Sequence, residues 1–521
     1  LTKYYATTYQ NATPLIMYKA VALVLRDILL KKKQDFNQQV RKTGSKRVYY
    51  LCMEFLIGRS LKNNLYNLGL TDIVEKIVNE AGMTLDQLYD MESDAGLGNG
   101  GLGRVAACFM DSLASENYPA MGFSIRYDYG FFKQKIVDNT QVELPDMWLD
   151  TGEVWMMPRS DKSFIVKIGG NIVQHWDKDG LHIEHNNASI IEAIPYDVMI
   201  SGYDSRGVSV LRLWRATGVQ DFDMKSFTQG DYYNAMRAEN EAEIISKVLY
   251  PSDEHYAGKQ LRLSQQYFLV SASLQSIIKD HLKVYNSLDN LPDKVAIHIN
   301  DTHPALAVPE LMRLLMDEYG YSWERAWDMT VNTIAYTNHT VMSEALEKWS
   351  EDLFKIRLPR IYQIVCEIDA RFKGEHKDVP ADKLKNMCVI GNGQIRMANL
   401  CVIGSHSING VSALHSEIIK ESVFHDFYEI LPERFTNVTN GIAHRRWLNQ
   451  SNPQLAGLIT ELIGDGYVKD ASQLSKLDKY YDDKSVLHKL AQIKQNNKNS
   501  FADYIKKHSG FVLNPESRFD V

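Results

Sequence analysis

The sequence has few cysteines and none of the signals that direct a chain into or across a membrane. Its five cysteines lie far apart with apolar neighbours and form no CxxC pair; they are Cys52, Cys108, Cys366, Cys388 and Cys401. This spacing predicts reduced, buried thiols rather than disulfides or a zinc site. The chain also lacks a signal-peptide-like start and any run of about 18 apolar residues. We therefore expect a soluble, cytoplasmic protein with no membrane partner.

Long basic runs are absent as well. Lysine and arginine number 58 against 65 aspartate and glutamate, a formal charge of −7 over 521 residues. A mildly acidic chain offers no extended cationic surface, so we expect no nucleic-acid partner. The sequence contains no internal repeat, P-loop, GxSxG elbow, kinase signature, HExxH or calcium loop, and so predicts no metal site. No pair of carboxylates stands out as catalytic.

The elements that are present predict an α/β protein. Thr13 is expected to cap a first helix that ends at the solvated Lys31, Lys32 and Lys33. Alternating, aromatic-rich runs over residues 122–213 predict an antiparallel insertion. Beyond Asp231, strands alternate with helices, as in a parallel sheet. The strands expected are 48–52, 295–299, 331–336 and 398–403, and the last three lead to helices over 304–319, 341–349 and 411–420.

A glycine-rich string is the most conspicuous local motif. Five glycines fall within residues 96–103 and open a helix, and the string fits GxGxxG at Gly96, Gly98 and Gly101. Glycine lets backbone N–H groups at a helix start approach an anion closely. The acidic residues 88–95 lack the strand that a dinucleotide site needs. A tight packing turn, a backbone contact to a ligand, and a nicotinamide or flavin site all remain open.

Polar residues follow four of the apolar segments. Because the carboxyl ends of parallel strands share one edge of a sheet, these groups are expected to converge on one crevice. Uncharged donors and acceptors suit a hydroxyl-rich ligand, and a sugar is the natural candidate. The four segments end at Ile299, Tyr336, Ile403 and Phe435, and the residues that follow them include Asn300, Asp301, His303, Asn338, His339, His406, Asn409, Asn437 and Asn440.

Simpler roles compete with this interpretation. Asp301 or Thr302 would serve well as a helix cap before Pro304. His339 alone is more often a satisfied buried histidine than a site residue. The histidines of residues 182–185 are expected on the surface of an alternating strand.

Several strings resemble the glycogen phosphorylase family of α-glucan phosphorylases. The resemblance implies a two-lobe, GT-B-like glycosyltransferase fold. Residues 1–440 would form the N-terminal glucan-binding α/β lobe, a mainly parallel sheet flanked by helices with an antiparallel β-rich insertion. Residues 441–521 would begin the C-terminal lobe that binds pyridoxal phosphate and phosphate. The matching strings are residues 49–59, 94–112, 258–269, 296–304, 335–349, 404–417 and 436–448.

The resemblance implies reversible phosphorolysis of the non-reducing terminal glucosyl unit of an α-1,4-glucan, with retention, to glucose 1-phosphate. The partners would be glycogen, starch or maltodextrin, inorganic phosphate, and a second copy meeting across residues 231–250. The family carries pyridoxal 5'-phosphate on a lysine within Gly-Thr-Gly-Asn-Met-Lys, a string absent from these 521 residues. We therefore expect a truncated second lobe and a chain that is inactive by itself. The alternative is a non-catalytic glucan-binding or dimerisation protein.

Site residues follow from the resemblance by position. His339 resembles the family's catalytic histidine, which contacts the glucosyl unit. Asn440 resembles the asparagine that binds the sugar's primary hydroxyl. Asp301 resembles an aspartate beside the glucosyl site, and Asp253 an aspartate of a gate loop over the substrate.

The glycine string has a counterpart in the family as well. Gly100, Gly101 and Leu102 resemble the loop whose backbone N–H groups face the sugar and the phosphates. Of these, Gly101 would lie near the cofactor phosphate.

Overall fold

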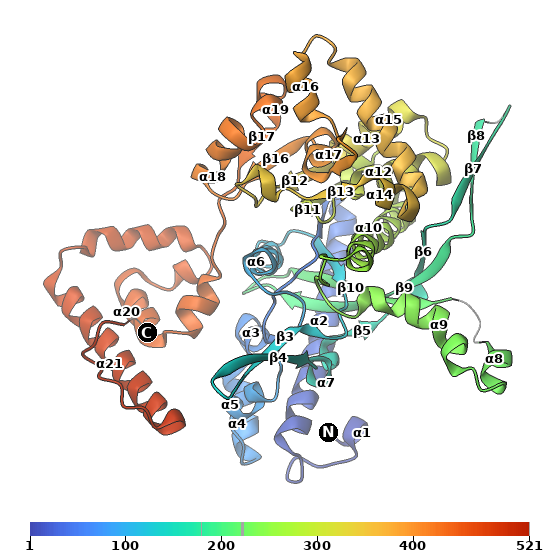
Figure 1. Ribbon diagram of the computed structural model, residues 1–521. Helices are drawn as coiled ribbons and strands as arrows, with labels where there is room; N and C mark the ends of the chain where they lie inside the picture. The colour runs from blue at the N-terminus through green and yellow to red at the C-terminus, as the bar shows by residue number, and fades with distance from the viewer. Residues whose placement is uncertain (179, 220–222, 520–521) are drawn as a thin grey trace. The chain divides into compact units, whose positions relative to one another are not determined.

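A ten-stranded sheet organises the first of two units into which the chain divides, Leu1–Asn440 (Figure 1). The structure is a computed structural model that describes residues 1–178, 180–219 and 223–519. The sheet strands are β1 (Arg47–Leu51), β2 (Ala120–Ile125), β5 (Met157–Pro158), β6 (Phe164–Ile168), β9 (Ser189–Ser201), β10 (Val208–Gly218), β11 (Val295–Asn300), β12 (Ile334–Thr337), β16 (Ser407–Gly410) and β17 (Phe435–Asn437).

The strand order is β17-β16-β12-β11-β1-β2-β10-β9-β5, with β6 also paired to β9. Every pairing from β17 to β10 is parallel. The pairings of β9 with β10, β5 and β6 are antiparallel. The mainly parallel α/β fold with an antiparallel region is therefore confirmed, although β2 belongs to the parallel part and not to the antiparallel insertion. Further antiparallel pairs are β3 (Gly130–Val137) with β4 (Thr140–Asp146), β7 (Asn171–Asp177) with β8 (Gly180–Asn186), and β15 (Gln394–Arg396) with β13 (Lys348–Ser350) and β14 (Ile390–Gly391).

Helices surround the sheet, and the β7–β8 hairpin extends away from the rest of the unit (Figure 1). The helices of this unit are α1 (Thr2–Tyr5), α2 (Pro14–Thr43), α3 (Ser60–Asn67), α4 (Thr71–Glu80), α5 (Leu85–Asp90), α6 (Gly101–Ser115), α7 (Leu149–Gly152), α8 (Met224–Thr228), α9 (Tyr232–Glu243), α10 (Tyr256–Tyr285), α11 (Leu291–Lys294), α12 (Ala307–Arg313), α13 (Trp323–Thr333), α14 (Glu351–Arg357), α15 (Pro359–Glu375), α16 (Ala381–Met387), α17 (Met397–Ile403), α18 (Ala413–Ile418) and α19 (His425–Ile430).

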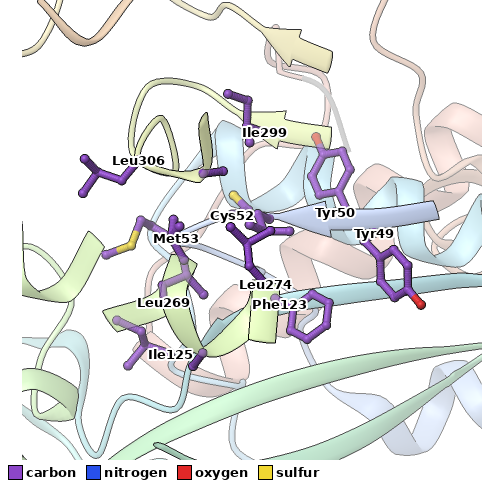
Figure 2. Packing of buried hydrophobic residues seen from close by; sticks show 14 of the residues in the cluster. Tyr49, Tyr50, Cys52, Met53, Phe123, Ile125, Leu269, Leu274, Ile299 and Leu306 are labelled. Carbon is purple, nitrogen blue, oxygen red and sulfur yellow. The ribbon is translucent and has the colours of Figure 1, made fainter. Parts of the chain in front are cut away.

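The core lies where α10 meets the parallel strands. Figure 2 shows Leu269 and Leu274 of α10 beside residues of β1, β2 and β11, among them Phe123 and Ile299. From Leu263 to Ile278 most of α10 is buried, because strands and other helices cover it on several sides. Burial of this apolar surface supplies the main stabilisation of the unit.

The first helix differs from its prediction at its end. Thr13 caps α2 as expected, and its Oγ1 accepts a hydrogen bond from the backbone N–H of Ile16 (3.3 Å). The prediction that the helix ends at a solvated Lys33 is wrong. The helix continues to Gly44, which adopts the left-handed conformation (φ 63°) that commonly ends helices. Lys33 is half-buried within the helix, and this burial lowers its pKa.

Two further predictions are wrong. A short apolar segment does not show whether its hydrophobic residues repeat with the period of a helix or of a strand. Residues 398–403 belong to the fully buried helix α17 and do not form a strand; the strand is β16, four residues later. Residues 341–349 are not a helix. They form a 3₁₀ turn at Ser343–Ala345 and the start of β13.

The second unit, Gly441–Val521, contains helices and, among its described residues, no strand. Its α-helices are α20 (Pro453–Ile463) and α21 (Lys484–Ser509), and the fully buried Tyr467 donates its hydroxyl to the carbonyl of Ala456 in α20 (3.2 Å). The assignment of the two units to a glucan-binding lobe and to the start of a cofactor lobe stays a prediction.

The described residues also bear on the cysteines and on membrane insertion. All five cysteines are free, but Cys108 and Cys366 are only half-buried, so the expectation of full burial is wrong for these two. No helix in the described ranges combines the length and the apolar composition needed to cross a bilayer.

Candidate active site

The carboxyl ends of four neighbouring strands, β11, β12, β16 and β17, meet at one edge of the sheet. Polar residues at the ends of β12 and β16 are hydrogen-bonded to one another. Thr337 Oγ1 donates to Asn409 Oδ1 (2.8 Å), and the backbone N–H of Asn338 donates to the carbonyl of Asn409 (3.0 Å). The predicted convergence of these strand ends is therefore present in the fold.

His406 is the exception. It precedes β16, its backbone N–H donates to the carbonyl of Ile334, and its ring Nδ1 lies 3.1 Å from the carbonyl of Val331. These contacts place His406 at the amino end of the strands. The sequence assigned it to the carboxyl edge because residues 398–403 were expected to be the strand.

His339 follows β12 and is half-buried at the carboxyl edge. Its Nε2 lies 2.7 Å from Oδ1 of the fully buried Asn300, whose Nδ2 in turn donates to Cys52 Sγ (3.2 Å). Burial lowers the pKa of His339. Asp301 opposes that shift, and His415 and His303 add to it. The imidazole is therefore neutral at neutral pH.

Asp301 is held in an unusual backbone conformation at the end of β11. Its φ is 61°, in the left-handed region, and its Oδ1 accepts the N–H of Thr302 (2.7 Å). The expectation that Asp301 or Thr302 caps the following helix is wrong, because α12 begins only at Ala307. A non-glycine residue held in this region costs energy that surrounding contacts must offset, and such residues cluster at functional sites.

The glycine string wraps around a buried carboxylate. Glu54, just after β1, accepts the backbone N–H of Asn99 at Oε2 (2.9 Å). A Cβ at Gly103 would lie 2.8 Å from Glu54 Cβ, and one at Gly98 would lie 3.2 Å from its Oε2. At Gly100 a Cβ would meet nothing within 4 Å. The string therefore combines a tight packing turn with an open backbone segment.

The open segment starts α6. Gly100 is its N-cap, and no side chain of the described residues caps the helix. A Cβ at Gly101 would also meet nothing within 4 Å, so the first turn of the helix is accessible from outside. The preceding element is the helix α5 and not a strand, so the structure does not support a dinucleotide site.

We expect Gly103→Ala to lower the free energy of unfolding by about 1–3 kcal/mol, because the new methyl group would overlap Glu54. Gly100→Ala is the matched control, since its backbone is extended and its surroundings are open. Urea denaturation of the two variants checks this. Equal midpoints for both would contradict the packing described here.

A second set of contacts joins the predicted gate residue to the strand ends. Arg262 of α10 pairs with Asp253 (3.4 Å) and with Glu347 (3.1 Å). Glu347 accepts the hydroxyl of Thr302 (3.4 Å), so the ion pairs reach the residue that follows Asp301. Asp253 itself is 54% exposed. The ion pair with Arg262 holds Asp253 at one end of these contacts, and its exposed side chain is accessible to a ligand.

Tyr250 links the same loop to the glycine string. Its hydroxyl donates to Glu54 Oε1 (2.5 Å), and its ring contacts the ring of His303 and the guanidinium of Arg262. Burial, followed by the charge of Glu54, raises the pKa of Tyr250 far above its ordinary value, so the hydroxyl remains a donor.

Asn440 lies beyond β17, with its side chain exposed. Its backbone N–H donates to the carbonyl of Val411 (2.9 Å), which follows β16. His415 of α18 lies between this segment and His339: its Nδ1 accepts the N–H of Val411 (3.1 Å), and its Nε2 lies 3.3 Å from the carbonyl of Thr340. Asp301, His339 and Asn440 thus follow β11, β12 and β17 at this edge, whereas Gly100, Gly101 and Leu102 start α6 and Asp253 precedes α10.

Sequence reasoning missed several residues that hold this edge together. They have ordinary positions in helices or loops, and their partners are distant in sequence: Tyr250 and Glu54 are 196 residues apart. No local pattern marks them. The residues missed are Tyr250, Arg262, Glu347 and His415.

Comparison with known proteins gives this edge a context. A sequence model described as carbohydrate phosphorylase matches residues 78–521. The chain belongs to the carbohydrate phosphorylase family. The resemblance on which the sequence analysis relied is thereby confirmed, and the parallel sheet with its helices is consistent with a lobe of a phosphorylase of the GT-B type.

Curated members of the family align along nearly the whole chain. It is 46% identical over 517 residues to a glycogen phosphorylase of Bacillus subtilis. The aligned region covers 99% of this chain and 64% of that relative. It is 44% identical to a glycogen phosphorylase of Synechocystis (97% and 60%) and to the muscle form of Bos taurus (98% and 62%). The chain thus spans less than two thirds of the length of these phosphorylases.

Proposed function

We propose that this protein is a glycogen phosphorylase that transfers the terminal glucosyl unit of an α-1,4-glucan reversibly to inorganic phosphate, with retention of configuration. The observation that carries the proposal is the neutral His339 at the carboxyl edge of the sheet. Among the described residues, none hydrogen-bonds to its Nδ1, which is left to accept from a ligand. The names and similarity of the curated relatives support the same reaction.

His339 is the residue to which we assign the catalytic role. A neutral ring accepts a hydrogen bond from a sugar hydroxyl, whereas an imidazolium would repel the positive charge that develops on the glucosyl carbon. The backbone carbonyl of His339 would also stabilise that charge. We assign Asp301, which follows β11, to the sugar pocket. We assign Asn440 to a contact with the primary hydroxyl of the sugar.

The first turn of α6 fits the phosphate of pyridoxal 5'-phosphate. The N–H groups of Gly101 and Leu102 lack a capping side chain, and the absence of a Cβ at Gly100 and Gly101 leaves room for an anion. We propose that Gly101 contacts the cofactor phosphate. Gly100, Gly101 and Leu102 together are assigned to contacts with phosphate or sugar. When bound, the cofactor would supply a phosphate that gives and takes a proton. The lysine that anchors it in the family is not in this sequence.

The remaining assignments concern the surroundings of the site. Asp253, held by Arg262, is assigned to a gate over the substrate. The helix α9 lies within the segment by which a homodimer would form, and we place the protein in the cytoplasm. The substrate would be glycogen, starch or maltodextrin together with inorganic phosphate.

The test is glucose 1-phosphate release from maltoheptaose and inorganic phosphate, measured on the protein produced from its complete coding sequence and on the 521-residue chain. We expect release by the first and none by the second, which should still bind maltoheptaose in calorimetry. Maltoheptaose binding without turnover or pyridoxal absorbance in either protein would favour a non-catalytic glucan-binding protein. Release by the 521-residue chain would overturn the expectation that it is inactive alone.

A further inference from the structure

We propose that Asn300 and Cys52 are positioning residues that hold His339 as the neutral Nε2–H tautomer, so that Nδ1 is its acceptor toward the ligand. The inference rests on the role proposed for His339 but concerns how the fold prepares that ring. It is carried by a hydrogen-bonded chain across three adjacent strand ends, which joins Cys52, Asn300 and His339.

The chain of contacts is sealed from solvent at its inner end. Cys52 follows β1, Asn300 ends β11, and both are fully buried. Figure 2 shows Cys52 surrounded by apolar side chains, among them Ile299 and Leu306. Water therefore has no access to the amide of Asn300 from this side, and its two polar atoms find their partners within the protein.

The sulfur of Cys52 sets the direction of the chain. It accepts the backbone N–H of Glu54 (3.5 Å) and lies 3.2 Å from Nδ2 of Asn300. Burial raises the pKa of the Cys52 thiol to about 12, so the thiol keeps its proton, and the lone pairs of Sγ accept both N–H groups. With Nδ2 directed to the sulfur, Oδ1 of Asn300 faces His339.

An amide oxygen can only accept a hydrogen bond, so Nε2 of His339 must carry the proton in the 2.7 Å contact. A neutral imidazole has one proton, and Nδ1 is then left with its lone pair. Asn300 also gives no charge to the ring, so it does not favour the imidazolium as a carboxylate would.

Neighbouring ionisable groups shift the pKa of His339 in opposite directions, so an uncharged partner at position 300 matters. Asp301 raises the pKa of His339, while His303 on the same loop and His415 of α18 lower it. His298 of β11 is half-buried, and its pKa is lowered to about 4 by burial and by the neighbouring His339 and His406. An uncharged partner at position 300 leaves burial as the dominant influence, and the ring stays neutral.

The direct test is the tautomer itself, read from the nitrogen resonances of the 521-residue chain labelled with ¹⁵N-histidine. The His339 signals are identified by their loss in His339→Gln. We expect a protonated Nε2 and a pyridine-type Nδ1 at neutral pH. A protonated Nδ1 in the unmodified chain would overturn the inference without any variant.

Two substitutions test the parts of the chain. Cys52→Ser keeps an acceptor next to the amide and is expected to leave the tautomer unchanged. Asn300→Asp introduces a carboxylate and is expected to raise the pKa of His339 above its ordinary value of about 6.5. A pKa of His339 that is unchanged in Asn300→Asp would contradict the positioning role.

Turnover provides a readout that a merely structural role would not produce. In the protein from the complete coding sequence, Asn300→Asp should lose about tenfold in kcat for each pH unit below the raised pKa and recover at higher pH. A loss independent of pH would overturn the inference. If the unmodified complete protein shows no phosphorolysis but the Nε2–H tautomer is present, the proposed function fails while the positioning of His339 stands.

Discussion

Replacing Asp197 by alanine is expected to lower the free energy of unfolding by about 3–5 kcal/mol. Asp197 of β9 lies directly opposite Arg212 of β10, and the two form a bidentate pair with distances of 2.8 and 2.9 Å. Both side chains are almost completely buried. Without the carboxylate, the guanidinium keeps the hydroxyl of Ser276 (2.9 Å) and the face of the Trp214 ring, and it remains as a buried charge with no described carboxylate bonded to it.

The same pair predicts a pH dependence. Burial raises the pKa of Asp197, but the hydrogen bonds and charge of Arg212 outweigh burial, and the pKa in the folded protein lies below its ordinary value. The stabilisation is therefore present above the unfolded pKa of about 3.9 and is lost as the pH falls through the folded pKa. In Asp197→Ala, the part of the free energy of unfolding that depends on ionisation of this carboxylate should be absent.

Urea denaturation followed by tryptophan fluorescence measures the effect. The matched control is Asp161→Ala, which removes an equally close bidentate pair with Arg159 (2.8 and 2.7 Å) from an aspartate that is 62% exposed. Solvent screens that pair, so the control midpoint should stay close to that of the unmodified protein. Equal losses in the two variants would show that burial does not govern the contribution of the ion pair.

The second large effect is expected at the proposed catalytic residue. In the protein from the complete coding sequence, His339→Ala should lower kcat for maltoheptaose phosphorolysis by about 10²-fold or more, the range seen when one preorganised polar contact to a transition state is removed. The loss should appear in kcat more than in KM, because the contact strengthens as charge develops on the glucosyl carbon.

The control for His339 is another histidine beside the same strands. His406 lies at their amino ends, where its ring contacts the carbonyl of Val331. His406→Gln should leave kcat unchanged, because ligands of open parallel sheets bind at the opposite edge. A kcat for His339→Ala within twofold of the unmodified enzyme would refute the role assigned to this residue.

Local patterns in the sequence were enough to place the glycine string at the start of a helix, Thr13 at a cap, β1 as a buried strand and β11 in a parallel sheet. They failed where an apolar segment was short. The buried segment 398–403 reads equally well as strand or helix, and only its packing on all sides as α17 decides between them. Because of this error, His406 was predicted at the carboxyl edge of the sheet, whereas it lies at the amino ends of the strands.

By itself, then, the sequence determined the α/β class, the resemblance to the phosphorylases, and the residue types that follow each strand. The tertiary structure alone decided which of these residues meet. The contact of Asn300 with Cys52 spans 248 residues, and that of Arg262 with Glu347 spans 85. Such pairs depend on the order of strands in the sheet. That order results from burial of the whole core around α10, and no local propensity or spacing encodes it.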